Sequence, residues 1–219
     1  MSHYALQILN LLAALLLLTT FAMLSQRRIL TLIRLFTLHG AILVASALVV
    51  AYVTHDVHLY YSAALTFALK VVLIPWILHK LILRLNVKWD VDTLINIPST
   101  MLAGIVLVII AFNLALPVAQ LSASIARGAL GIALACILLS FMMMITRSKA
   151  VPQVIGFLAM ENGLFFAATA ATSGMPMIVE LGIALDILIG ILILGVFMFQ
   201  IREQFDNLDI HNLESLKED

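Results

Sequence analysis

Four ionisable side chains stand inside long apolar stretches of the sequence: His39, Lys70, Glu161 and Asp186. A charged side chain at the centre of a bilayer costs about 2.5–3.5 kcal/mol on insertion scales, so such residues persist when they are paired, hydrated or used. Each lies roughly 10–12 residues into its stretch, which places it about 15–18 Å along a helix and close to the membrane midplane. Titratable groups at one depth are what a lateral proton relay requires, because each can pass a proton to its neighbour or to shared water.

Static roles fit the same residues. Lys70 and Asp186 could form an ion pair that only fixes the fold, since buried pairs are often structural. Glu161, which precedes Asn162, could act as polar glue between helices. His39 could be an ordinary packing histidine with its hydrogen bonds satisfied.

The elements that must position these residues are apolar helices. The chain is 63% hydrophobic and 11% charged, whereas soluble domains are near 45–50% and 25%. Seven stretches can cross a bilayer, which takes about 20 residues each. We place them at 4–25, 29–53, 58–83, 98–117, 125–146, 151–172 and 176–201. The sequence therefore predicts an all-α, polytopic membrane protein with about seven transmembrane helices.

Prolines punctuate these stretches. Pro98, Pro152 and Pro176 stand at helix starts, where a missing N–H costs nothing, and Pro117 is expected to close the fourth span. Pro75 leaves the carbonyl one turn earlier, at residue 71, without its donor, so a kink just beyond Lys70 is expected.

The distribution of Lys and Arg predicts the orientation. Ten of the twelve fall on one side of the membrane, Arg127 falls on the other, and Lys70 lies within a span. The ten are Arg27, Arg28, Arg34, Lys80, Arg84, Lys88, Arg147, Lys149, Arg202 and Lys217. The positive-inside rule then puts the N-terminus outside and the C-terminus in the cytoplasm. Because 12 acidic residues balance the 12 basic ones, no net field attracts nucleic acid.

A weak internal repeat divides the transmembrane domain, residues 1–201. Spans one to three (1–84) and five to seven (125–201) share a pattern of helix, short basic turn, helix, outside turn and helix, and residues 85–124 hold a loop and a linking helix. Lys70 aligns with Asp186 in this comparison. The two repeats are expected to run parallel, as in some transporters. Residues 202–219 form a polar, acidic tail that we expect in the cytoplasm, docked on a partner.

Sequence signals for catalysis are absent. The chain has one cysteine, Cys136, and no Gly-rich phosphate loop, His-Glu-x-x-His, Cys-x-x-Cys or nucleophile elbow. We therefore expect a non-catalytic subunit with no cofactor or metal of its own.

The chain resembles a known family in several short motifs. The C-terminal part, from the basic turn at 146–149, resembles the K-type small membrane subunit of complex I and the C subunit of Mrp-type antiporters. The whole chain is similar to the component E family of hydrogenase-4 and formate hydrogenlyase. The matching residues are Ile155-Gly156, Met160-Glu161-Asn162-Gly163, Asp186 followed by Ile-Leu-Ile-Gly-Ile, Asn207-Leu208-Asp209-Ile210, and the run Lys70-Val71-Val72-Leu73-Ile74-Pro75.

This resemblance implies a role for two of the carboxylates. Asp186 matches the second carboxylate of the complex I subunit, shortened from Glu. The first carboxylate position of that subunit falls on Leu158, and Glu161 follows three residues later, on nearly the same helical face.

The resemblance also implies a multi-subunit setting. It predicts a membrane-arm subunit of a group 4 [NiFe]-hydrogenase-type complex in the prokaryotic inner membrane, with antiporter-like membrane subunits and peripheral hydrogenase-like subunits as partners. Three functions remain open: proton or ion translocation through Glu161, Asp186, Lys70 and His39; a structural adaptor with statically paired charges; and a subunit of an Mrp-type cation/proton antiporter.

Overall fold

The computed structural model describes residues 3–85, 94–121 and 126–172, together with Gly182 and Gly190. The elements in this part of the chain are α1 (His3–Ser25), α2 (Ile29–Thr54), α3 (Val57–Thr66), a π-helical segment η1 (Phe67–Leu73), α4 (Ile74–Leu85), α5 (Ile97–Leu121), α6 (Ala126–Thr146) and α7 (Ala150–Thr172). Six helices are long and apolar enough to cross a membrane, α3, η1 and α4 counting as one. The prediction of an all-helical fold is confirmed at this level, and the expected seventh span at 176–201 lies outside the described residues.

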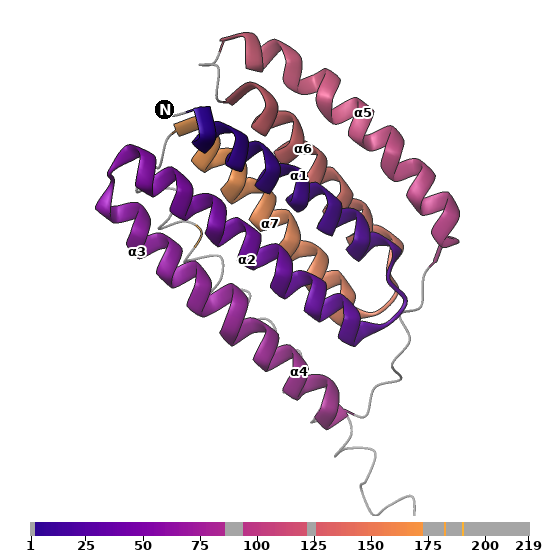
Figure 1. The fold of residues 1–219 in the computed structure, drawn as a ribbon. Coiled ribbons are helices and arrows are strands. Elements are labelled where there is room, and N and C mark those ends of the chain that lie inside the picture. The colour runs from indigo at the N-terminus through magenta and orange to yellow at the C-terminus, as the bar shows by residue number, and fades with distance from the viewer. Residues whose placement is uncertain (1–2, 86–93, 122–125, 173–181, 183–189, 191–219) are drawn as a thin grey trace, which may run out of the picture.

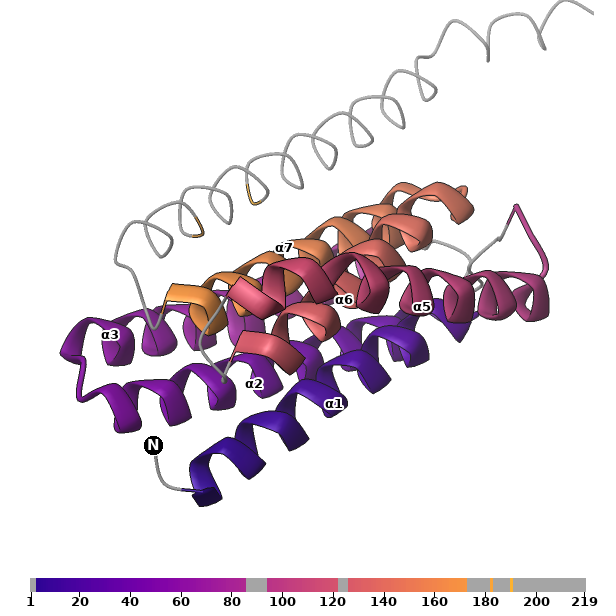
Figure 2. The same ribbon diagram turned by 90° about the horizontal axis from the view of Figure 1, so that it is seen from above.

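The helices form two layers of three. One layer holds α1, α2 and the rod made of α3, η1 and α4, and the other holds α5, α6 and α7 (Figures 1 and 2). The layers meet where α1 packs on α6 and α2 packs on α7. The largest apolar cluster fills this junction and includes Leu32, Phe36, Leu139 and Leu158, all fully buried. The parallel repeats and the orientation remain predictions.

The third rod changes its helical pattern at the buried lysine. Residues 67–73 are π-helical, and the N–H of Ile74 donates to the carbonyl of Leu69, five residues earlier. Pro75 follows at once and has no N–H to donate. The helix is therefore irregular at Lys70 itself, and the kink expected just beyond Lys70 stays a prediction. A π segment widens the helix by one residue and changes which way the side chains after it face.

Two glycines set the separation of α6 and α7. A Cβ added to Gly163 would lie 3.0 Å from Ile137 Cγ1 and 3.3 Å from its amide nitrogen. A Cβ added to Gly156 would lie 3.2 Å from the carbonyl oxygen of Ser140. These distances are tighter than most real Cβ contacts, so a side chain at either position would require its neighbour on α6 to move, and the two glycines are close-packing points between the helices.

Prolines lie at the helix starts and within α5. Pro98 and Pro152 lie in the first turns of α5 and α7, as predicted, and Pro176 lies outside the described residues. The fourth apolar span ends at Pro117, as predicted. The helix itself continues through Pro117 to Leu121, because a proline in a membrane helix removes one hydrogen bond without stopping the helix.

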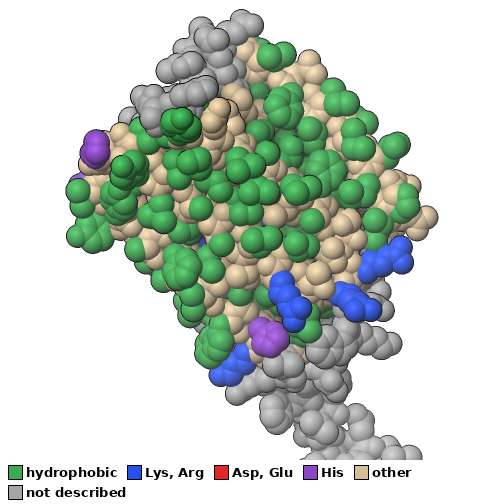
Figure 3. Space-filling view, viewed as in Figure 1, with side chains coloured by type: hydrophobic (Ala, Val, Ile, Leu, Met, Phe, Trp, Pro, Cys, Tyr) green, Lys and Arg blue, Asp and Glu red, His purple; other side chains and the backbone are tan. Residues whose placement is uncertain are grey.

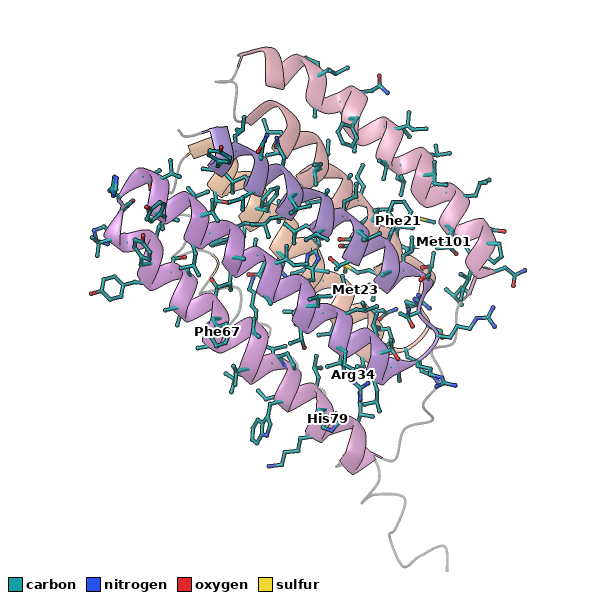
Figure 4. All side chains as sticks on the ribbon, viewed as in Figure 1. Phe21, Met23, Arg34, Phe67, His79 and Met101 are labelled. Carbon is teal, nitrogen blue, oxygen red and sulfur yellow. The ribbon has the colours of Figure 1, made fainter. Side chains whose placement is uncertain are left out.

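The surface carries a broad apolar belt with basic side chains at one end. Figure 3 shows Lys and Arg gathered at the lower end of the face, where Figure 4 places Arg34 and His79. Arg147, one of the ten basic residues that the sequence places on one side of the membrane, is buried in the structure. Its Nη2 donates to the carbonyl oxygen of Leu24 at 2.6 Å, near the C-terminus of α1, where a cation is favoured by the helix dipole. Burial lowers the pKa of the Arg147 guanidinium, because the charged form loses hydration.

Candidate functional site

The centre of the site is a buried ion pair. Lys70 Nζ lies 3.0 Å from Glu161 Oε1, and the two side chains are 2% and 4% exposed. Lys70 comes from the π segment of the first layer and Glu161 from the middle of α7 in the second, so the pair joins the two layers. Because α7 begins at Ala150, Glu161 lies about 16 Å from that helix end, well inside the span.

Neighbouring groups fix the position of Lys70. On α7, Phe165 lies one turn beyond Glu161, and its ring centroid is 6.0 Å from Lys70 Nζ, within reach of a cation–π contact. On α2, a Cβ added to Gly40 would lie 3.5 Å from both the Cβ and the carbonyl oxygen of Lys70, so the π segment packs directly on α2. The lysine is thereby held between a carboxylate and a ring, with its backbone against a third helix.

His39 precedes Gly40 on α2 and is completely buried. Its Nδ1 lies 2.9 Å from Thr19 Oγ1 on α1. The Thr19 hydroxyl also donates to the carbonyls of Leu15 and Leu16 on its own helix, each at 2.9 Å. A hydroxyl has one proton, so Thr19 accepts from Nδ1–H, and in the neutral imidazole Nε2 is then the acceptor. Nε2 is buried and has no protein partner in the described part of the chain.

Other buried polar atoms also lack protein partners. Asn162, next to Glu161, is 0% exposed, and neither Oδ1 nor Nδ2 meets a partner among the described residues. The hydroxyl of Ser140 on α6 is in the same situation. Buried polar groups in native proteins are nearly always satisfied, so these atoms are sites where ordered water or a residue outside the described ranges can bind.

The structure thus brings together two of the four predicted site residues and places a third close by. Lys70 and Glu161 are paired, and His39 lies on α2 next to the glycine that contacts Lys70. Asp186 lies outside the described residues, so its pairing with Lys70 is not tested. Within residues 3–85, 94–121 and 126–172, no group of three or more His, Cys, Asp or Glu could hold a metal ion.

Sequence reasoning missed two members of the site. Thr19 fixes the tautomer of His39, and its signal was a Thr-Thr pair within the otherwise apolar run of α1. Phe165 faces Lys70, and an i, i+4 spacing from Glu161 was its signal. Both depend on contacts between helices, which the sequence does not specify.

Comparison with known proteins gives two relatives that differ in coverage. The Mycobacterium tuberculosis H37Rv protein named Uncharacterized protein Rv0085 is 30% identical over 194 residues, or 88% of each chain. The chain belongs to the Rv0085 family. Hydrogenase-4 component E of Escherichia coli K12 is 28% identical over 117 residues, 53% of this chain and 54% of the relative, and the Shigella flexneri component E matches equally well. The chain therefore spans about half the length of component E.

The Rv0085 family member described here is thus a distant relative of hydrogenase-4 component E, and its six apolar helices indicate a multi-pass membrane protein. No protein-family model matches the chain. No solved structure matches it either.

Proposed function

We propose that this chain is a membrane-arm subunit of a hydrogenase-related complex and contributes to proton or ion movement through the membrane by way of Lys70, Glu161, His39 and Asp186. The distant similarity to hydrogenase-4 component E supports the proposal that the chain is part of a hydrogenase-related membrane complex. The ion pair between Lys70 and Glu161 carries the proposal of ion movement, because ionisable residues inside a span are rare and commonly mark the path of an ion or a proton.

The pair can couple the arrival of a proton to a displacement of charge. A proton that binds the Glu161 carboxylate neutralises the anion beside Lys70 Nζ at 3.0 Å. The ammonium then loses the negative charge of Glu161 beside it, which favours either release of its own proton or movement toward another carboxylate. One protonation event at Glu161 is thereby passed on through Lys70.

Asp186 is the proposed next carboxylate. Gly182 lies against Phe165, since a Cβ added to it would be 3.7 Å from the ring. In the span that the sequence predicts at 176–201, residue 186 would follow residue 182 by one helical turn, just as Phe165 follows Glu161 on α7. If the predicted span at 176–201 is antiparallel to α7, Asp186 faces Glu161 across that contact.

His39 is proposed to extend the path toward α1 and α2. Its Nε2 is a buried acceptor with no protein partner in the described part of the chain, and Asn162 offers further unsatisfied polar atoms. Water between such groups would complete a hydrogen-bonded chain, because water can both accept and donate.

A structural adaptor is the competing function, and one observation favours it. Lys70 and Glu161 contact each other directly at 3.0 Å, as a pair that only holds two layers together also would. An adaptor requires the pair for assembly, whereas a conductor requires protons to bind it.

The deciding experiment measures proton uptake by the purified complex in proteoliposomes. Glu161→Gln leaves the Lys70 ammonium without its anion, so the main variant is the double change Lys70→Met and Glu161→Gln, which removes both charges together. Uptake is expected to fall to background while the complex stays assembled. Ser62→Ala is the matched control, because it removes another buried polar atom that does not titrate in this pH range.

Two further variants test the extension of the path. Asp186→Asn is expected to abolish uptake, and His39→Asn, which keeps an N–H for Thr19 but does not titrate, is expected to slow it severalfold. Full uptake in the double variant would refute ion movement through the pair, and loss of assembly in the double variant would favour the adaptor.

The proposed setting is tested separately by mass spectrometry of the native complex. A hydrogenase-like large subunit and iron–sulfur proteins are expected to co-purify with the chain. If cation/proton antiporter subunits co-purify without any redox protein, the assignment to a hydrogenase-related complex is wrong and the Mrp-type alternative takes its place.

A further inference from the structure

α5 is the least buried of the six spans in the described part of the chain. Only 22% of its most apolar window is buried, against 33–56% for the others, and it lies at one edge of the bundle (Figure 1). Leu102, Val106, Ile109 and Leu116 are all more than half exposed on it. Lipid and protein suit such an apolar face equally, so these residues alone do not say what covers it.

Asn113 interrupts this apolar face. Ala111 and Ala115 are buried against the bundle, and α-helical geometry places residue 113 about 200° round from residue 111, which points it away from the bundle. Its side chain is exposed, and Nδ2 donates to the carbonyl of Ile109 at 2.8 Å. Asn113 lies about 24 Å along α5 from its start at Ile97, within the length that crosses the bilayer.

Pro117 adds a second polar atom at the same point. An α-helical residue at position 117 would donate its N–H to the carbonyl of Asn113, and proline has none to give. Asn113 therefore presents two acceptor oxygens, Oδ1 and its backbone oxygen, and one amide N–H beyond the one bonded to Ile109. Such groups are costly in hydrocarbon unless a neighbouring segment supplies a hydrogen-bond partner.

We propose that this face of α5, centred on Asn113 and including Val106, Ile109 and Leu116, is the docking surface for a transmembrane helix of another membrane subunit. The partner helix carries a hydrogen-bond donor, such as a hydroxyl, an amide or a cationic group, at the depth of Asn113. A second copy of this chain fits less well, because it would bring the same excess of acceptors. The inference rests on the multi-subunit part of the proposed function and not on ion movement.

The test uses a benzophenone amino acid at position 109 or 116 in the full chain, in membranes that contain the natural complex. Irradiation is expected to attach both positions to a transmembrane segment of a different protein, and peptide mapping identifies that segment and its donor side chain. Asn113→Leu is expected to lower the yield about fivefold, the effect of one hydrogen bond between helices, and Asn113→Gln to restore most of it. A probe at Leu18, an exposed position of α1, is the control whose products should not change with Asn113.

Three results overturn the proposal. They are adducts with lipid alone, a cross-link to a second copy or to residues 176–201 of the same chain, and a protein adduct whose yield does not respond to Asn113→Leu. Because Asn113 is exposed, Asn113→Leu should leave the thermal stability of the purified chain unchanged, which separates loss of docking from loss of folding. Proton uptake is measured separately, so a negative cross-linking result would overturn the docking surface on α5 without affecting the proposed ion path.

Discussion

The ion pair between Lys70 and Glu161 can be tested by removing its two charges singly and together. The perturbations are Lys70→Met, Glu161→Gln and the double variant, each close in volume to the residue it replaces. Stability is expected to fall sharply in either single variant and to recover in the double variant, because only the single variants leave a buried charge without its partner.

The distance between Lys70 Nζ and Glu161 Oε1 sets the magnitude of the expected change in stability. At 3.0 Å and an effective dielectric constant of about 20, the attraction between unit charges is about 5.5 kcal/mol. Desolvation of both ions offsets much of this, so the intact pair contributes little net stability. Removing one partner leaves the desolvation cost of the other, and the free energy of unfolding should fall by about 3–5 kcal/mol. The double variant should lie within about 1 kcal/mol of the natural chain, since apolar replacement of a buried pair is often neutral.

The assay is reversible unfolding of the purified chain in mixed micelles, with SDS as the denaturant and circular dichroism as the signal. The coupling energy is the difference between the double variant and the sum of the two single variants, and at least about 2 kcal/mol is expected. Arg147→Met combined with Glu161→Gln is the matched control. Arg147 lies between α6 and α7 and bonds to Leu24, whereas Glu161 lies about 16 Å into α7. The effects of these two changes on stability should therefore add.

One result would refute this reasoning. If Lys70→Met and Glu161→Gln add within about 0.5 kcal/mol, the two side chains do not interact in the folded protein. The proposed transfer of protonation from Glu161 to Lys70 would then lose its physical basis.

Three further predictions concern packing. Gly163→Ala should lower the free energy of unfolding by about 1–3 kcal/mol, because its Cβ would meet Ile137 at 3.0 Å. Gly40→Ala should be neutral or slightly stabilising in the same SDS titration, because its Cβ would lie 3.5 Å from the nearest atoms of Lys70. Arg147→Met should lower the free energy of unfolding by about 1.5–3 kcal/mol through loss of its 2.6 Å hydrogen bond. Arg27 is exposed, so Arg27→Met should lower it by less than about 0.5 kcal/mol. Equal losses in the two variants would contradict the buried position of Arg147. Cys136, 1% exposed, should react with a maleimide only after unfolding, and rapid labelling in mild detergent would contradict its burial.

Hydropathy in the sequence was sufficient to define six spans with boundaries close to those observed. A span is a local property, because about 20 consecutive apolar residues must form a helix in lipid whatever surrounds them. For the same reason, the depth of His39, Lys70 and Glu161 could be read from their positions within their stretches.

Only the tertiary structure decided which groups meet. The sequence suggested Asp186 as a possible partner of Lys70, a pairing that lies outside the described residues, and it gave no sign that Glu161 lies 3.0 Å from Lys70. The structure also turns Arg147 inward to the end of α1 and places Thr19 against His39. Which partner a buried charge finds depends on the rotation of each helix about its axis, on the one-residue shift introduced by the π segment at 67–73, and on which helices lie side by side. Helix rotations and helix neighbours are set by packing between segments far apart in the chain, and the hydropathy of one segment does not determine them.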